Sequence, residues 1–232
     1  QIIGIERPGA MQSYWTVPAA NLFRVPDSLT MEHAALIEPT AVAVHDVRMA
    51  DLRAGEYAIV LGGGPIGALI ALVARQKGAR VLITEINPFR IQMLRGLGFE
   101  VVNPREDKWV DHVLAATGGA GADVVFEVTG VAAGAEMMTQ ALRSRGRVVI
   151  VGVFAKPAPV DLYKFFQKEL WLTGARVYQR EDFAEAIDLL ARKTIEAPKI
   201  ITNRMPLSKL GDGLEMMASG APVMKILVEC NA

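Results

Sequence analysis

Three glycines and an acid stand at the spacing with which proteins bind a dinucleotide. Gly62, Gly64 and Gly67 form a G-x-G-x-x-G pattern, and Glu85 follows the last glycine at about the distance that dinucleotide-binding sequences require. In such a turn the first glycine permits a tight bend, the second lets backbone approach a pyrophosphate, and the third lets a helix pack closely on a strand. The acid would accept hydrogen bonds from ribose hydroxyls and repel a 2′-phosphate, which favours NAD over NADP.

The residues around these glycines form the elements that such a site needs. An apolar run at residues 58–61 predicts a buried parallel strand, and dense apolar residues at 66–77 predict a helix that lies against a sheet. Gly78 ends this helix, and residues 81–84 predict a second strand. The alternatives are a glycine-rich turn without a ligand and a turn that binds S-adenosylmethionine, but the third glycine and the apolar helix favour a dinucleotide.

Strand and helix patterns alternate from residue 54 to residue 174, which predicts an α/β fold with a doubly wound parallel sheet of about six strands. Right-handed crossovers would place helices on both faces, and the ligand would bind at the carboxyl ends of the strands. The predicted strands are residues 58–61, 81–84, 99–102, 122–128, 147–151 and 169–173. The pattern also predicts a strand at 13–17, helices at 40–50 and 132–142, and strands at 199–205 and 223–228.

The composition argues against several classes of function. Lys+Arg and Asp+Glu are both 25, so the zero net charge gives no reason to expect a nucleic-acid partner. No apolar run is long enough to span a membrane, and the single Cys230 rules out an internal disulfide and suits the reducing cytoplasm. The three histidines, at positions 33, 45 and 112, lack the spacing of metal ligands, whereas a zinc site needs three protein ligands. The chain is therefore not expected to hold zinc by itself.

Four further segments resemble those of a known protein family. They are P-G-A-M-Q-S-Y-W-T-V-P (8–18), A-A-L-I-E-P-T-A-V-A-V-H-D-V (34–47), T-E-I-N-P-F-R (84–90) and V-M-K-I-L-V (223–228). Together with the glycine turn, they make the chain similar, over nearly its whole length, to the medium-chain dehydrogenases/reductases. The most similar branch is the zinc-type polyol branch, which includes sorbitol, butanediol and threonine dehydrogenases.

The resemblance implies a division of the chain into three parts. Residues 39–176 would form a Rossmann-type dinucleotide-binding domain. Residues 1–38 and 177–232 would be remnants of a β-rich, GroES-like catalytic domain at the two ends. Family members are longer on their N-terminal side, where the zinc ligands lie, so this chain is expected to be a truncated and inactive form.

Glu38 is the residue outside the turn to which the resemblance gives a chemical role. In the polyol branch the matching glutamate lies beside zinc and often reaches it through water, so Glu38 would be a catalytic and metal-site residue that helps to move a proton. It would do so only with ligands from the missing N-terminal part. The alternative is a carboxylate that is favoured by the positive end of a helix.

The resemblance also implies a set of cofactor-binding residues. Ile66 would press on the back of the nicotinamide, although it also suits plain core packing. Arg90 would lie beside the ribose that Glu85 binds, and Lys225 would reach the pyrophosphate unless it is a solvated lysine on an edge strand. The expected set is Gly62, Gly64, Pro65, Ile66, Gly67, Glu85, Arg90, Thr129, Val151, Val153 and Lys225.

The expected function is reversible hydride transfer between NAD and a secondary alcohol or ketone, with zinc in the intact protein. The substrate would be a polyol, a sugar derivative or a hydroxy amino acid. Two alternatives stay open: a zinc-independent, NADPH-dependent quinone or enone reductase of the same superfamily, and a non-enzymatic dinucleotide-binding module. The protein is expected in the cytoplasm as a homodimer or homotetramer that forms through the sheet edge near Leu170–Thr173, because an exposed apolar edge is otherwise an aggregation hazard.

Overall fold

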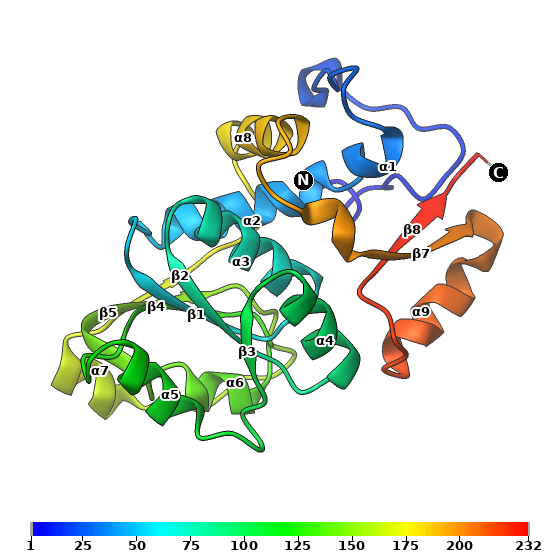
Figure 1. Ribbon diagram of the computed structural model, residues 1–232. Coiled ribbons are helices and arrows are strands. Elements are labelled where there is room, and N and C mark those ends of the chain that lie inside the picture. Colours follow the sequence, from blue (N-terminus) through cyan, green and yellow to red (C-terminus); the bar gives the residue numbers. More distant parts are fainter. Residues whose placement is uncertain (1, 232) are drawn as a thin grey trace.

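A six-stranded parallel sheet is the centre of the computed structural model, which describes residues 2–231 (Figure 1). Its strands are β1 (Tyr57–Leu61), β2 (Arg80–Thr84), β3 (Glu100–Val102), β4 (Ala122–Glu127), β5 (Leu142–Ile150) and β6 (Trp171–Gly174). The strands lie in the order β3-β2-β1-β4-β5-β6, and every neighbouring pair is parallel. From β1 the chain adds strands first on one side, to β3, and then on the other side, from β4 to β6. The carboxyl ends of β1 and β4, where this change of side occurs, are the usual place for a ligand. The predicted doubly wound sheet is confirmed.

Helices cover both faces of this sheet. They are α2 (Ile37–Met49), α3 (Pro65–Gln76), α4 (Pro88–Gly96), α5 (Trp109–Ala116), α6 (Ala132–Met137), α7 (Leu162–Lys168) and α8 (Arg180–Ala191). One core cluster joins Ala58 and Val60 of β1 to α2, α3 and α8, whereas the other joins Ile59 and Leu61 to α5 and α7. Because successive strand residues face opposite sides, a strand covered on both faces must be apolar throughout, which explains why every residue of β1 is buried.

The remaining elements flank the sheet at the two ends of the chain. They are η1 (Ala19–Asn21), α1 (Met31–Ala34), η2 (Ala197–Ile200), β7 (Ile201–Pro206), η3 (Leu207–Lys209), α9 (Leu210–Ala218) and β8 (Lys225–Glu229). The strands β7 and β8 pair with each other in a separate parallel sheet, which lies apart from the six-stranded sheet together with α9 (Figure 1). Within residues 2–231 no helix is long and apolar enough to cross a membrane.

Three sequence-based boundaries are wrong. Residues 13–17 form no strand, because side-chain pattern alone does not make a strand where no neighbour supplies ladder hydrogen bonds. The helix predicted at 40–50 is α2, which begins earlier, since the first turn of a helix tolerates Pro39. The helix predicted at 132–142 ends at Met137, because Leu142 pairs with Ala122 and already belongs to β5.

Candidate functional site

The glycine turn joins the end of β1 to the start of α3. Gly62 has a φ of 99°, which side chains disfavour, and a Cβ on Gly67 would lie 2.0 Å from the carbonyl oxygen of Gly62. Gly63, which the G-x-G-x-x-G pattern does not require, is equally constrained, because its Cβ would lie 2.5 Å from Cδ1 of Leu94. The turn is therefore closely packed, and it needs glycine at positions 62, 63 and 67.

The first turn of α3 presents backbone donors that its N-cap residue does not cap. Gly64 is the N-cap and has no side chain to accept a hydrogen bond, Pro65 begins the helix, and its first turn carries no acidic residue. A Cβ on Gly64 would approach only Nη1 of Arg90, at 3.8 Å. The Nε atom of Arg90 is buried and has no hydrogen-bond partner among residues 2–231. Uncapped N–H groups, a helix dipole and a guanidinium together suit an anion.

Glu85 lies directly after β2 and reaches back to the turn. Its carboxylate is buried and accepts a hydrogen bond from the Gly63 N–H at 3.0 Å. The other oxygen accepts from the N–H groups of Ile86, at 2.7 Å, and Asn87, at 2.9 Å. Nη1 of Arg90 lies 3.9 Å from the carboxylate. Glu85 therefore holds the glycine turn in place, and it retains at most part of its acceptor capacity for a ribose.

The ends of β4 and β5 form the next part of this edge. Thr129 follows β4 and lies against the glycine turn, since a Cβ on Gly62 would come within 3.0 Å of its Cγ2. Val151 is half-buried after β5, whereas Val153, two residues on, is 92% exposed. Ile66 is partly buried and packs against the core cluster on the α3 face of the sheet, so it contributes to core packing.

Glu127 is a buried acid at the same edge that the sequence pattern did not single out. It is the last residue of β4, is fully buried, and accepts hydrogen bonds from the Thr129 and Gly130 N–H groups, at 2.9 and 3.2 Å. A charged residue within the otherwise apolar run V-V-F-E-V was the signal that could have identified it, because a buried acid needs dedicated partners.

Glu38 lies in the first turn of α2 and belongs to a different part of the molecule. Burial by the surrounding protein raises the pKa of its carboxyl although part of the side chain reaches solvent, and the ammonium of Lys225 partly offsets this rise. Burial also raises the pKa of Tyr178, and the charge of Glu38 adds to that rise. Lys225 opens β8 in the second sheet. The fold thus brings Tyr178 and Lys225 each within electrostatic reach of Glu38.

The donor set of the described residues does not fit zinc. Within residues 2–231 no three His, Cys, Asp or Glu side chains come together in a way that could hold a metal ion. Nδ1 of His45 pairs with Asp182 at 2.9 Å, and Nε2 of His112 pairs with Glu100 at 2.6 Å. These two histidines are engaged in protein contacts, and no reaction step is assigned to a metal on these residues.

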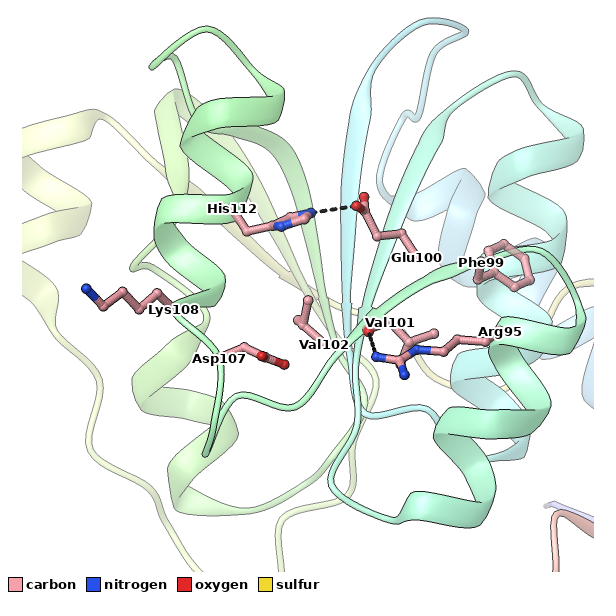
Figure 2. A pocket seen from close by; sticks show the side chains of 8 residues that line it. All are labelled: Arg95, Phe99, Glu100, Val101, Val102, Asp107, Lys108 and His112. Carbon is pink, nitrogen blue, oxygen red and sulfur yellow. Dashed lines mark hydrogen bonds and ion pairs between the residues drawn. The ribbon is translucent and has the colours of Figure 1, made fainter.

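A hollow of about 560 Å³ lies away from the glycine turn, beside the edge strand β3 (Figure 2). In Figure 2 the pair of His112 and Glu100 spans it between α5 and β3, and Arg95 donates a hydrogen bond to the Val101 carbonyl at 2.9 Å. Its lining residues are Arg95, Phe99, Glu100, Val101, Val102, Asp107, Lys108 and His112. The lining carries charges of both signs and few apolar residues, so it indicates no class of ligand. The carboxyl edge of the sheet at the glycine turn is the better candidate.

Known proteins resemble the whole of this chain. The family described as zinc-binding dehydrogenase matches residues 65–192. The 2-dehydro-3-deoxy-L-galactonate 5-dehydrogenase of Pseudoalteromonas atlantica is 46% identical over 232 residues, which are 100% of this chain and 68% of that protein.

Two solved structures of longer proteins share the fold over most of this chain. The 2R,3R-butanediol dehydrogenase from Bacillus subtilis has a TM-score of 0.83 at 33% identity, and the match covers 89% of this chain and 60% of that one. A zinc-binding dehydrogenase from Sinorhizobium meliloti 1021, solved with NADP bound, has a TM-score of 0.87 at 30% identity, with 97% and 67% covered. The chain thus spans 60% of the length of the butanediol dehydrogenase and 68% of that of the galactonate relative. Since the family match takes in more than half of the sequence and is joined by a 46% identical relative, the chain belongs to the zinc-binding dehydrogenases, within the medium-chain dehydrogenases/reductases that its motifs resemble.

Proposed function

We propose that this chain provides the NAD-binding part of a dehydrogenase that transfers hydride between nicotinamide and a secondary alcohol or ketone. The observation that carries the proposal is the uncapped first turn of α3, with Arg90 aimed at Gly64 and no acid in that turn. The names of the relatives, which refer to a sugar-acid dehydrogenase and a butanediol dehydrogenase, support a polyol, sugar derivative or related hydroxy compound as the substrate.

In this proposal the residues of the glycine edge bind and orient the cofactor, which itself supplies the hydride chemistry. The N–H groups that begin α3 would hold the pyrophosphate, and the free acceptor capacity of Glu85 would bind the adenosine ribose. Thr129, Val151 and Val153 would form the opposite wall of the cleft. Ile66 would support the nicotinamide, and Lys225 would approach the pyrophosphate from the second sheet.

We further propose that residues 1–38 and 177–232 belong to the catalytic domain of the longer protein, and residues 39–176 to its cofactor domain. Zinc and the proton-transfer role of Glu38 belong to that longer protein, because the described residues bring no zinc-binding donor set together. The chain by itself would bind NAD weakly and oxidise no alcohol. Turnover by a sample of this chain whose intact mass has been verified would contradict that statement.

Titration of the cofactor by fluorescence tests the central proposal. NADH should bind more tightly than NADPH, because Glu85 repels a 2′-phosphate. Replacing Arg90 by Gln should weaken NADH binding about tenfold, since it removes one charge-assisted contact. Arg95→Gln on the same helix is the matched control and should bind as the wild type does. Tighter binding of NADPH would instead favour the zinc-independent reductase, and no binding of either would end the proposal.

We also propose that the chain associates with a second copy through the edge of β6. This strand pairs only with β5 among residues 2–231, and it leaves Trp171 71% and Leu172 50% exposed. An exposed apolar edge favours a partner, and pairing across a two-fold axis would supply one. Light scattering should report a dimer or tetramer, and Trp171→Arg should shift it toward monomer. A wild-type monomer at high concentration would contradict this.

A further inference from the structure

Glu127 gathers backbone donors from two loops at once. Its carboxylate accepts the N–H groups of Thr129, at 2.9 Å, and Gly130, at 3.2 Å, and it also accepts the Thr129 hydroxyl. Its carbonyl oxygen accepts the N–H groups of Val151, at 2.9 Å, and Gly152, at 2.8 Å. One residue therefore fixes the turn after β4 and the loop after β5. Both loops carry residues assigned above to the wall of the cofactor cleft.

The space around this carboxylate is kept clear of side chains. A Cβ on Gly134 would lie 2.2 Å from Oε1 of Glu127, and a Cβ on Gly152 would lie 2.6 Å from Oε2. The two loops also touch each other, since a Cβ on Gly130 would lie 2.7 Å from the Val153 carbonyl oxygen. Glycine is thus required on both sides of the acid, and the carboxylate fills a cradle built from backbone.

The position of Glu127 in the sheet connects this cradle to the glycine turn. It pairs with Leu61, the last residue of β1, on one side and with Ile150 of β5 on the other. The turn that it holds lies against Gly62 through Thr129. An apolar residue at this buried position would stabilise the sheet at lower desolvation cost, so the carboxylate contributes something other than burial. The carboxylate instead holds the backbone of the turn after β4 in a fixed position next to Gly62.

We propose that Glu127 is a positioning residue that holds the loops after β4 and β5 in the geometry that receives the dinucleotide. The inference rests on the proposed function, because the ligand is the cofactor proposed there. The carboxylate of Glu127 acts through Thr129 and Gly130, whose turn contacts the loop after β5, and it needs no contact with the cofactor itself. Second-layer hydrogen bonds of this kind commonly decide how precisely a site is formed.

The test compares two acid-to-amide changes on the same strand. Glu127→Gln replaces an oxygen by an NH₂ group that cannot accept from a backbone N–H. Asp123→Asn is the matched control: Asp123 lies at the other end of β4 and accepts from the Tyr57 N–H at 2.8 Å and from Nε of Arg143 at 2.5 Å. Both variants should lose stability to urea. Only Glu127→Gln should weaken NADH binding, by about tenfold, and Asp123→Asn should bind NADH as the wild type does.

Hydrogen exchange gives a readout that does not depend on cofactor binding. Without ligand, Glu127→Gln should exchange the amides of Thr129 and Gly130 about tenfold faster than the wild type, relative to the amides of Val151 and Gly152, whose acceptor is the main-chain carbonyl that the variant keeps. Unchanged exchange at the Thr129 and Gly130 amides, or an equal loss of NADH affinity in both variants, would overturn the proposal. Should the wild type bind no dinucleotide, the proposed function and this inference both fail, and exchange would show only that Glu127 holds the loops.

If Glu127→Gln does not fold, Thr129→Val serves in its place. It removes the hydroxyl, which donates to Glu127 and accepts from the Val131 N–H at 3.3 Å, and it leaves the N–H groups of Thr129 and Gly130 on the carboxylate. It should weaken NADH binding about threefold. Thr129→Ser keeps the hydroxyl and should restore the affinity. Wild-type affinity in Thr129→Val, or no recovery in Thr129→Ser, would contradict a role for this hydrogen-bond set.

Discussion

Buried acids lie in two regions of the molecule, and the hydrogen-bond partners of their carboxylates differ between these regions. Among residues 2–231 four acids are buried, two at the carboxyl edge of the sheet and two where α2 packs on α8. At the sheet edge, Glu85 and Glu127 accept hydrogen bonds mainly from backbone N–H groups. At the helix junction, Asp182 accepts from Arg48, from His45 and from the Gln179 N–H, whereas neither oxygen of Asp46 has a partner among the described residues.

The two acids at the helix junction have pKa values that are shifted in opposite directions. Burial would raise the pKa of Asp182, but hydrogen bonds from Arg48, from the Gln179 N–H and from His45 outweigh it and lower the pKa to about 2. Burial raises the pKa of Asp46 to about 8, and the charge of Asp182 adds to the rise. The junction therefore holds one strongly paired acid and one bare acid. A series of acid-to-amide substitutions distinguishes these environments.

The largest effect is expected for Asp182→Asn. It leaves the buried His45 and the guanidinium of Arg48 without their anion, and breaking such a pair should cost about 3 kcal/mol at pH 7. The lowered pKa makes this contribution present above pH 3.8, and it is lost as the pH falls through about 2. Urea unfolding at pH 7 and at pH 3 measures both values, and a loss below 1 kcal/mol at pH 7 would show that the pair contributes little.

Asp46→Asn should have the opposite sign. The folded state keeps this acid protonated up to about pH 8, whereas the unfolded chain ionises it near 3.8. Wild-type stability from this group is therefore complete below pH 3.8 and is lost as the pH rises to about 8. The free energy of unfolding of the variant should be about 2 kcal/mol higher than that of the wild type at pH 8. The gain is limited because the buried amide also lacks hydrogen-bond partners, which costs free energy. The gain should vanish near pH 4, and a gain that does not change with pH would refute the argument.

Glu85→Gln should destabilise the protein by about 1.5 kcal/mol, since its NH₂ group cannot accept from a backbone N–H. Here the same isosteric change has the sign opposite to that at Asp46, although both acids are buried. Urea unfolding of the two variants side by side at pH 8 tests the contrast directly. If both variants were stabilised, or both destabilised, the contrast between Glu85 and Asp46 would be refuted.

The smallest effect is expected for Glu100→Gln, which provides the solvent-exposed reference. Glu100 pairs with His112 at 2.6 Å, and the two side chains are 49% and 40% exposed (Figure 2). An exposed pair of this kind should change the free energy of unfolding by less than about 1 kcal/mol. A larger change would mean that the hollow beside β3 depends on this pair more than its exposure implies.

The sequence predicts the sheet well because its strands are short apolar runs between turn residues. All six predicted strands occur, and the turn at Gly62 and Gly67 has the backbone approach that the glycine spacing implies. The misplaced elements depend on neighbours distant in the chain. The helix after Thr129 is cut short because Leu142 pairs with Ala122, and residues 13–17 lack a strand beside them. Local pattern carries no information on such pairing.

The candidate site is only partly predictable for the same reason. Gly62, Gly67 and Glu85 could be assigned because their roles follow from spacing along one β-α-β unit. Glu127 and Asp46 could not, because each is a single acid whose meaning depends on burial and on partners elsewhere. Lys225 illustrates a further limit: its proximity to Glu38 arises only when β8 folds back beside the start of α2.

The two edges of the six-stranded sheet differ in whether another strand could join them. β3 has three residues, and the Val101 carbonyl already accepts a hydrogen bond from Arg95 at 2.9 Å. β6, at the far edge, is at the end of the strand order, and the one such contact among the described side chains comes from within the strand, from the Thr173 hydroxyl to the Gly174 carbonyl at 3.5 Å. A sheet that can be extended at one edge only can pair with one other copy. The pair then has no open edge left to which a third copy could add. Association of this chain through β6 would therefore end at a closed pair, a tetramer would need a further contact between pairs, and the edges would not propagate into a fibre.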